Sequence, residues 1–389
     1  MDGCTPLLFG RFPQTALLTE SRARQGVCKK APSAAACGNL SVGRSAAPLL
    51  GTVLAFDNHA HAMHATLAFA AFAALTPSPT PSARILVVGA SGGTGSRALR
   101  GLIDVGYKPS QLRVLTRDPS KPSLEPHREL GIELLGADLD DPTTLRGVAD
   151  GCTGCYVHST AGDTKKLDTG EVQRAQHLAA SIKESGGLTH VVYNSAAAEP
   201  THGVVRIAQK HAVEDVFSTE FGLPSTCLRA NLFMEELWKS YTRPPILKGT
   251  YPFSLPPDRA VYLTSVRDMG RLAGACLARP DAAPAAGASA RKLNVASELT
   301  SPSKMAEAFA KAQGSPCVHK RARLLRWIAR LFLPDLYEVI QFYRTSTETT
   351  DIDALREEFP SLLTPFPDFL EETRWGDTEA TYEDLARSL

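Results

Sequence analysis

The chain is 389 residues long, a length that permits two or three domains, although one large α/β domain with an extension fits it better. Its 42 lysines and arginines nearly balance its 41 aspartates and glutamates. The resulting net charge of +1 gives no reason to expect nucleic acid or an anionic membrane as the main partner. The eight cysteines are spread thinly, which argues against a secreted domain held together by disulfides.

Residues 1–80 differ in composition from the rest of the chain. They are rich in Ala, Ser, Leu and Thr, and their basic residues outnumber their acidic ones, which is typical of an organelle transit peptide. The apolar segment 66–75 is far shorter than the ~20 residues of a membrane span, so we expect no integral membrane association. It does match the hydrophobic region of a signal peptide, and Met63 precedes it. We predict a disordered targeting leader and linker with a plastid (chloroplast) address. A mitochondrial or secretory route through a bipartite leader, and a translation start at Met63, stay open.

A glycine-rich turn follows the first element of the body. The short apolar run Ile85–Val88 predicts a buried parallel strand, and 94–105 reads as a helix. The turn between them has the spacing G-x-x-G-x-x-G, which lets bare backbone approach a diphosphate at the start of a helix. We predict that these residues bind a dinucleotide: Gly89, Ser91, Gly92, Gly93, Thr94 and Gly95.

Strand and helix signals then alternate along the chain. Further strands are predicted at 111–116, 132–135, 155–158, 189–193 and 223–228. Helices are predicted near 143–148, 167–184 and 206–221. This alternation predicts an α/β fold, a doubly wound parallel sheet with right-handed crossovers.

The regular alternation ends near Asn231. The segment 241–257 is rich in prolines and aromatic residues and cannot form a central strand. Helices are predicted at 266–278 and 302–313, a strand at 292–295, and a mainly helical tail at 320–370. We therefore predict one domain over 84–389, in which 231–389 forms a smaller, mainly helical lobe on the substrate or partner side.

Ligands of such sheets bind at the carboxyl ends of the strands, beside the point where the strand order reverses. Beyond the glycine turn, the candidate cofactor-binding residues at predicted strand ends are Arg117, Asp138, Leu139, Ser159 and Ser195. Arg117 stands where a carboxylate would favour NAD, and its guanidinium suits the 2′-phosphate of NADP(H) if Asp118 points away. Asp138 can accept from the adenine amino group while Leu139 packs on the ring. We predict NADP(H) as the cofactor, with a surface arginine and a turn aspartate as the alternatives.

Two other features are interpreted as structural. Cys152 and Cys155 lead into a strand and have no second pair, which favours packing over a reversible thiol switch and makes a poor zinc site. We predict no metal. His158, on the fourth predicted strand, is interpreted as a core residue in preference to a catalytic one.

The residues over roughly 84–372 resemble the NmrA-like family, a branch of the atypical short-chain dehydrogenases. The resemblance rests on the order and spacing of segments 87–95, 115–119, 136–141, 190–195, 210–214, 228–235, 266–270, 341–344 and 362–369. It implies a Rossmann fold that binds NADP(H). Within the family it implies either a small-molecule reductase or a redox sensor that binds the cofactor without turning it over.

Active members of the wider superfamily use a Tyr-x-x-x-Lys pair, and Lys210 resembles its lysine. The position four residues earlier holds Arg206, and Tyr193 on the fifth strand cannot stand in for the tyrosine. The lysine-only arrangement resembles isoflavone-reductase-like and NmrA-like proteins, in which the lysine alone serves as acid or base. We predict Lys210 as the catalytic residue and a cofactor contact, and Ser195 as the family's strand-five serine. The alternative for Lys210 is an ordinary helix-surface lysine.

Two functions are predicted from these residues. In the first, which we favour, the protein is an NADPH-dependent oxidoreductase that reduces a small carbonyl or unsaturated substrate in the plastid. In the second, it is a non-catalytic sensor of NADP(H) occupancy that acts through a regulatory protein partner. The intact Lys210 favours the enzyme, and the missing tyrosine favours the sensor.

Overall fold

The main sheet contains seven parallel strands. The computed structural model describes residues 79–158, 170–198, 203–322 and 334–388, and all statements below concern these residues. The strands are β1 (Ile85–Val88), β2 (Leu112–Thr116), β3 (Glu133–Gly136), β4 (Gly154–Val157), β5 (His190–Ala196), β6 (Ser225–Ala230) and β10 (Arg291–Val295). Their spatial order is β10-β6-β5-β4-β1-β2-β3, and every pair is parallel. The order reverses between β1 and β4, which confirms the predicted doubly wound sheet.

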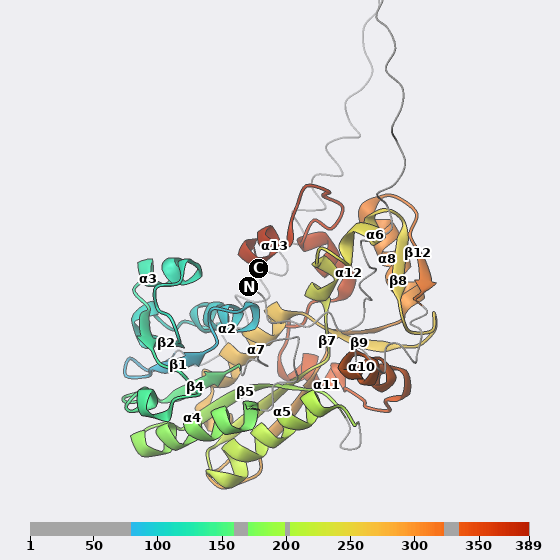
Figure 1. Cartoon of the computed structure of the whole chain (residues 1–389). Coiled ribbons are helices and arrows are strands. Elements are labelled where there is room, and N and C mark those ends of the chain that lie inside the picture. Colours follow the sequence, from blue (N-terminus) through green and yellow to red (C-terminus); the bar gives the residue numbers. More distant parts are fainter. Residues whose placement is uncertain (1–78, 159–169, 199–202, 323–333, 389) are drawn as a thin grey trace, which may run out of the picture. The chain divides into compact units, whose positions relative to one another are not determined.

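Helices cover both faces of this sheet (Figure 1). One face carries α2 (Gly93–Asp104) and α7 (Val266–Leu277), and the other carries α4 (Glu171–Ser185) and α5 (Val205–Asp215). The side chains of β1 alternate between the two faces: Ile85 and Val87 belong to the core under α2 and α7, and Leu86 and Val88 to the core under α4. Because both faces are covered, this strand is a continuous apolar run rather than an alternating pattern.

The predicted helices on the second face have the expected positions, with shifted ends. α4 is followed by Gly186, whose left-handed φ of 69° is typical of a glycine that caps a helix C-terminus. α5 continues as a π-helical turn, Val216–Glu220. The helix predicted near 143–148 is instead a 3₁₀ turn, Pro142–Leu145, capped by Asp141. The remaining short elements of this half are α3 (Glu125–Glu129) and the 3₁₀ turns Pro109–Gln111 and Pro122–Leu124.

Glycines bring α2 and α7 into direct backbone contact. A Cβ atom on Gly101 of α2 would lie 2.1 Å from the carbonyl oxygen of Gly270 on α7. A Cβ atom on Gly274 would lie 2.4 Å from the carbonyl oxygen of Gly101. Neither position has room for any side chain, so the pairing of the two helices depends on glycine at both.

The main sheet takes more of the late chain than the sequence indicated. α7 and β10 lie beyond Asn231, in the part predicted as the second lobe, yet α7 packs on the sheet and β10 is its seventh strand, paired with β6. The cause is that a parallel strand needs only a crossover to reach the free edge, and α7 supplies it. The 3₁₀ turn Pro280–Ala282 lies between them.

The rest of the chain beyond Asn231 forms a second lobe with its own aromatic core. Its helices are α6 (Arg243–Leu247), α8 (Pro302–Gln313), α10 (Pro334–Thr345), α12 (Phe366–Glu372) and α13 (Tyr382–Ser388), with a 3₁₀ turn at Met234–Trp238. The helix α11 (Ile352–Glu358) instead packs through Leu355 on the core under α2 and α7. Its strands are β7 (Leu232–Phe233), β8 (Thr250–Phe253), β9 (Val261–Thr264), β11 (Glu298–Thr300) and β12 (Val318–Arg321), in two small sheets. As predicted for 241–257, the strand found there is not central: within the described ranges, β8 pairs with β12 alone. Among the described residues, no helix has the length and apolar character needed to span a bilayer.

The leader predicted over residues 1–80 falls almost wholly outside the described part of the chain, as do Ser159 and the segment 323–333 within the predicted helical tail.

Candidate functional site

The predicted dinucleotide turn lies at the carboxyl edge of the main sheet, directly between β1 and α2. Gly89 has a φ of +87°, and a Cβ atom on it would lie 2.8 Å from the carbonyl oxygen of His158, the residue after β4. A Cβ atom on Gly95 would lie 2.3 Å from the carbonyl oxygen of Gly89. Glycine is therefore needed at both positions, first for the turn and then for the close approach of helix to turn.

The outer side of the same turn is open. Ser91, Gly92 and Gly93 are exposed, and a Cβ atom on Gly93 would meet nothing within 4 Å. Gly92 caps α2 without a side chain, and the first helical turn holds no acidic residue. The first N–H groups of α2 are therefore not capped by a side chain, which suits an anionic group at the helix start. The buried Thr94 completes the predicted set.

Arg117 and Asp118 follow β2 with different surroundings. Arg117 is exposed. The Asp118 carboxylate accepts from the backbone N–H and the hydroxyl of Ser120, at 2.9 and 2.5 Å, and these bonds lower the pKa of Asp118. The Asp118 carboxylate is therefore bound within its own turn, while the exposed Arg117 side chain stands at the end of β2.

Asp138 and Leu139 lie in the turn after β3. The carboxylate of Asp138 accepts from the backbone N–H of Asp140 at 3.1 Å. Leu139 packs on the apolar core under α4, and its carbonyl oxygen lies 2.8 Å from Nδ1 of His177. These contacts hold the turn against α4 and keep Asp138 half-buried at the edge.

Ser195, the residue before the last of β5, faces α5, where its hydroxyl donates to Oε1 of Glu214 at 2.5 Å. Glu214 is fully buried and also accepts from Nε and Nη2 of Arg229 on β6, at 2.8 and 2.6 Å. The Lys292 ammonium lies 3.6 Å away. The hydroxyl proton of Ser195 is therefore used inside the protein, and only the oxygen's lone pairs remain for another donor.

Lys210 lies on α5, with its ammonium 3.0 Å from Oε1 of Glu171, the first residue of α4. The lysine side chain is 20% exposed and the glutamate 3%. The Tyr193 hydroxyl reaches the same oxygen at 3.3 Å, and the Tyr193 ring lies 5.9 Å from the ammonium. Sequence reasoning placed Lys210 on its helix but did not find Glu171, since the pair is 39 residues apart. Arg206 occupies the position four residues before Lys210, as the sequence shows.

A contact between His158 and Asn194 was missed by the sequence analysis. His158 follows β4 and Asn194 lies near the end of β5, and the amide nitrogen of Asn194 lies 2.7 Å from Nδ1 of the imidazole. Burial, together with the positive charge of Lys210, lowers the pKa of His158 to about 4, and Glu171 only partly opposes this. His158 is therefore neutral at physiological pH and makes a polar contact at the ends of β4 and β5. Its interpretation as a core residue in preference to a catalytic one stays a prediction. The available signal was the position of both residues at the ends of neighbouring strands.

The thiols of Cys152 and Cys155 are both free and buried. Burial raises the pKa of each, well above the usual value for Cys155. This favours the packing interpretation over a reactive thiolate.

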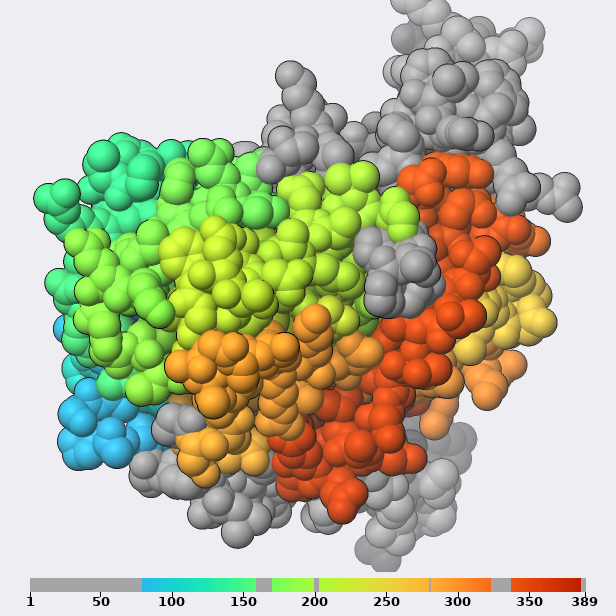
Figure 2. All heavy atoms as spheres, turned by 90° about the horizontal axis from the view of Figure 1, so that it is seen from below, coloured from blue at the N-terminus to red at the C-terminus, as the bar shows by residue number. Residues whose placement is uncertain are grey.

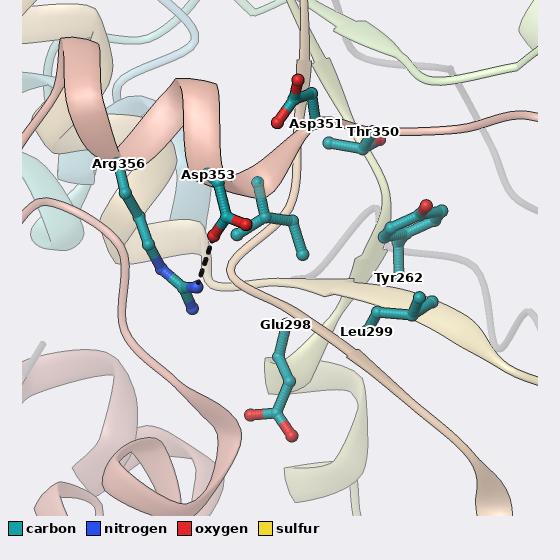
Figure 3. A pocket seen from close by; sticks show the side chains of 8 residues that line it. Tyr262, Glu298, Leu299, Thr350, Asp351, Asp353 and Arg356 are labelled. Atoms are coloured by element: carbon teal, nitrogen blue, oxygen red, sulfur yellow. Dashed lines mark hydrogen bonds and ion pairs between the residues drawn. The ribbon is translucent and has the colours of Figure 1, made fainter.

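The second lobe contains a hollow of about 420 Å³ that the sequence did not indicate (Figure 3). Its walls come from β9, β11 and the start of α11: Tyr262, Glu298, Leu299, Thr350, Asp351, Ile352, Asp353 and Arg356. Its charged groups are engaged with the protein itself. Arg356 pairs with Asp353 at 3.4 Å, and Glu298 accepts from the backbone N–H of Phe366 at 2.6 Å.

A smaller hollow of about 200 Å³ shares Tyr262 and Leu299 with the larger one and reaches Asn231, directly after β6. Phe342 of α10 lines it and also belongs to an apolar cluster against which Ile207 of α5 packs. Seen from the side of α4 and α5, the segment containing α10 borders α5 (Figure 2). Tyr262, Phe342 and Tyr343 of the second lobe thus form an aromatic wall beside α5, the helix that carries Lys210.

Comparison with known protein families matches residues 81–372 to the NmrA-like family. An NmrA-like family domain-containing oxidoreductase of Malbranchea aurantiaca is 25% identical over 264 residues, covering 63% of this chain and 76% of that protein. The chloroplastic protein High Chlorophyll Fluorescence Phenotype 244 of Arabidopsis thaliana is 26% identical over 194 residues, covering 50% of this chain and 48% of its own length. The chain thus spans about half the length of the Arabidopsis protein.

Two solved structures share the fold at low identity. Triphenylmethane reductase of Citrobacter sp., complexed with NADP(H), has a TM-score of 0.61 and 16% identity, covering 74% of this chain and 99% of its own. NmrA, a negative transcriptional regulator in complex with NADP, has a TM-score of 0.59 and 18% identity, covering 79% of this chain and 98% of its own.

Proposed function

Because the chain belongs to the NmrA-like family, we propose that it binds NADP(H) at the carboxyl edge of the main sheet and reduces a small carbonyl or unsaturated substrate. The observation that carries the proposal is the turn between β1 and α2. Its glycines leave bare backbone and the first N–H groups of α2 open on the outer side, which is the arrangement a diphosphate requires.

The surroundings of the strand ends support NADP(H) over NAD(H). A carboxylate at the end of β2 would favour an unphosphorylated ribose, but Asp118 is bound to Ser120, while Arg117 is exposed for a phosphate. The similar reductase was solved with NADP(H), whereas the similar regulator was solved with NADP and also with NAD. Asp138 and Leu139 would receive the adenine, and Ser159 stays a predicted cofactor contact outside the described residues.

Lys210 would serve on the nicotinamide side. Its ammonium is anchored by Glu171, which fixes where a proton is held, and the aromatic wall of the second lobe would line the substrate side. When bound, the cofactor supplies the hydride, and Lys210 holds the ribose and supports the proton transfer. Ser195 would accept a hydrogen bond from the ligand, since its own proton goes to Glu214.

A second function has one specific observation in its favour. Arg206 stands where the superfamily's tyrosine acts, so the usual proton donor is missing, and the similar NmrA is a transcriptional regulator. In this alternative the protein reports NADP(H) occupancy to a protein partner. A plastid location, proposed for either function, is supported by the basic leader and by similarity to the chloroplastic Arabidopsis protein.

The test measures binding first and turnover second. We expect calorimetry on the full chain to show NADPH binding well below millimolar levels, and NADPH oxidation with one or more members of a panel of quinones, enals and phenylpropanoid-like carbonyls. Tight binding without turnover across the panel would support the sensor instead. Absence of binding would overturn both.

Arg117→Ala tests the choice of cofactor. Loss of a charge-assisted contact to the 2′-phosphate should weaken NADPH binding about tenfold or more and leave NADH binding nearly unchanged. Arg100→Ala removes an exposed arginine on α2 that pairs with Asp104, and serves as the matched control. Equal losses for NADPH and NADH in Arg117→Ala would contradict the assignment.

A further inference from the structure

His158 and Asn194 lie where the second half of a bound dinucleotide must extend. If Arg117, at the end of β2, takes the adenosine half, the turn after β1 takes the diphosphate. The sheet order β5-β4-β1-β2 then directs the other half over the ends of β4 and β5. His158 follows β4 and backs directly onto Gly89 of the turn, and Asn194 lies near the end of β5.

The contact between the two side chains leaves one donor and one acceptor. The Asn194 amide nitrogen donates to Nδ1 of His158, so the proton of the neutral imidazole is on Nε2. Asn194 is 3% exposed, and its Oδ1 has no hydrogen-bond partner in the described structure. A buried amide oxygen without a donor is unfavourable by itself, which indicates that a ligand completes it.

The His158–Asn194 pair carries no charge, which suits a position beside a nicotinamide ring, because that ring is cationic when it is oxidised. The charged groups that act on His158 are Lys210 on α5 and Glu171 on α4, and burial and the lysine keep the imidazole neutral. A neutral histidine does not repel an oxidised nicotinamide ring, whereas an imidazolium would.

Resting on the proposed NADP(H) binding, we propose that His158 and Asn194 bind the primary carboxamide of the nicotinamide ring. Nε2–H of His158 donates to the carboxamide oxygen, and Oδ1 of Asn194 accepts from the carboxamide N–H. A primary carboxamide offers one acceptor and one donor in the same plane, which is the complement of what the pair leaves open.

The remaining polar side chains at these strand ends are engaged elsewhere. The hydroxyl protons of Ser195 and Tyr193 go to Glu214 and Glu171, and Lys210 also contacts Glu171. Among the described residues at the ends of β4 and β5, the His158–Asn194 pair is therefore the neutral donor–acceptor pair left for a ligand.

The experiment compares three ligands by calorimetry on the full chain. NADP⁺ carries the whole carboxamide, its 3-acetylpyridine analogue keeps the carbonyl and lacks the N–H, and 2′-phospho-ADP-ribose lacks the ring. We expect His158→Phe to weaken NADP⁺ and the acetyl analogue by about fivefold to tenfold, and Asn194→Ala to weaken NADP⁺ more than the acetyl analogue. His158→Gln, whose amide N–H replaces Nε2–H, should recover most of the affinity. None of these variants should change the affinity for 2′-phospho-ADP-ribose.

His190→Phe is the matched control. His190 is another buried histidine, at the opposite end of β5, where Nε2 lies 2.8 Å from the Thr226 hydroxyl. Its replacement should leave the ratio of the three affinities unchanged. The inference is overturned if His158→Phe and Asn194→Ala bind NADP⁺ like the wild type, or if they lose 2′-phospho-ADP-ribose to the same extent. If the wild type binds neither NADP⁺ nor 2′-phospho-ADP-ribose, the proposed function itself fails.

Discussion

Two regions of the molecule each bury a glutamate, and the two carboxylates differ in the hydrogen bonds and charges that surround them. Beside the main sheet, Glu214 is surrounded by donors from Ser195 and Arg229 and by the nearby Lys292. At the joint between the sheet and the second lobe, Glu235 accepts from the Ser265 hydroxyl and the Val266 N–H through one oxygen only.

The second oxygen of Glu235 has no hydrogen-bond partner in the described structure. Burial raises the pKa of Glu235 to about 7, and Asp268 adds to the rise against the hydrogen bonds that lower it. Burial also raises the pKa of the neighbouring Glu236 to about 7. The sheet region is therefore built around a compensated charge, whereas the segment around Glu235 holds carboxyls that titrate near neutral pH.

The sheet region should be the more sensitive to loss of its glutamate. Glu214→Ala leaves Arg229 and Lys292 without their shared carboxylate and Ser195 without its acceptor. We expect the free energy of unfolding to fall by about 3–5 kcal/mol, measured by chemical denaturation. Glu220→Ala, which removes a nearby exposed glutamate that contacts Gln176, should change it by less than about 1 kcal/mol. Similar losses in the two variants would remove the distinction drawn for Glu214.

The same region depends on the contact between α2 and α7. In Gly101→Ala the new methyl would meet the Gly270 carbonyl at 2.1 Å, so the two helices must separate. We expect a loss of about 3 kcal/mol in unfolding free energy and weaker binding of NADPH, because α2 also carries the glycine turn. Gly93→Ala on the same helix has open space around it and should not lower stability. A stable Gly101→Ala protein would show that the contact tolerates separation.

Glu235, at the joint between the sheet and the second lobe, should make the free energy of unfolding depend on pH. A carboxyl whose folded pKa is about 7, above the ordinary 4.5, stabilises the fold fully below about pH 4.5, and this contribution is lost as pH rises through 7. Glu235→Gln removes the titration while keeping an oxygen for Ser265. The variant should therefore gain stability relative to the wild type by about 2 kcal/mol between pH 5.5 and 7.5.

Glu236→Gln should shift the stability curve in the same direction, since burial raises the pKa of that carboxyl as well. His158 and His190, whose pKa values are lowered to about 4, act in the opposite sense, but equally in wild type and variants. The difference between denaturation curves across pH therefore isolates each glutamate. Parallel curves for the wild type and both variants would refute the comparison.

Much of the nucleotide-binding half was predictable from local pattern. The apolar run at Ile85–Val88, the glycine spacing after it and the alternation up to β6 each depend on neighbours in sequence. The place of β10 was not predictable, because its partner β6 lies some sixty residues earlier and pairing is decided in the sheet. The small sheets of the second lobe were not predictable for the same reason, because their strands also pair with partners distant in the sequence.

For the candidate site too, some features were predictable from the sequence and others depended on the tertiary structure. The sequence by itself determined which residues stand at strand ends, from Gly89 to Ser195, and which helix carries Lys210, because strand and helix periods fix where each element stops. Only the tertiary structure decided what each of them touches: Ser195 on Glu214, Lys210 on Glu171, and His158 on Asn194. Parallel strands bring their carboxyl ends together whatever the chain length between them, so partners 36 residues apart become neighbours without any local signal in the sequence.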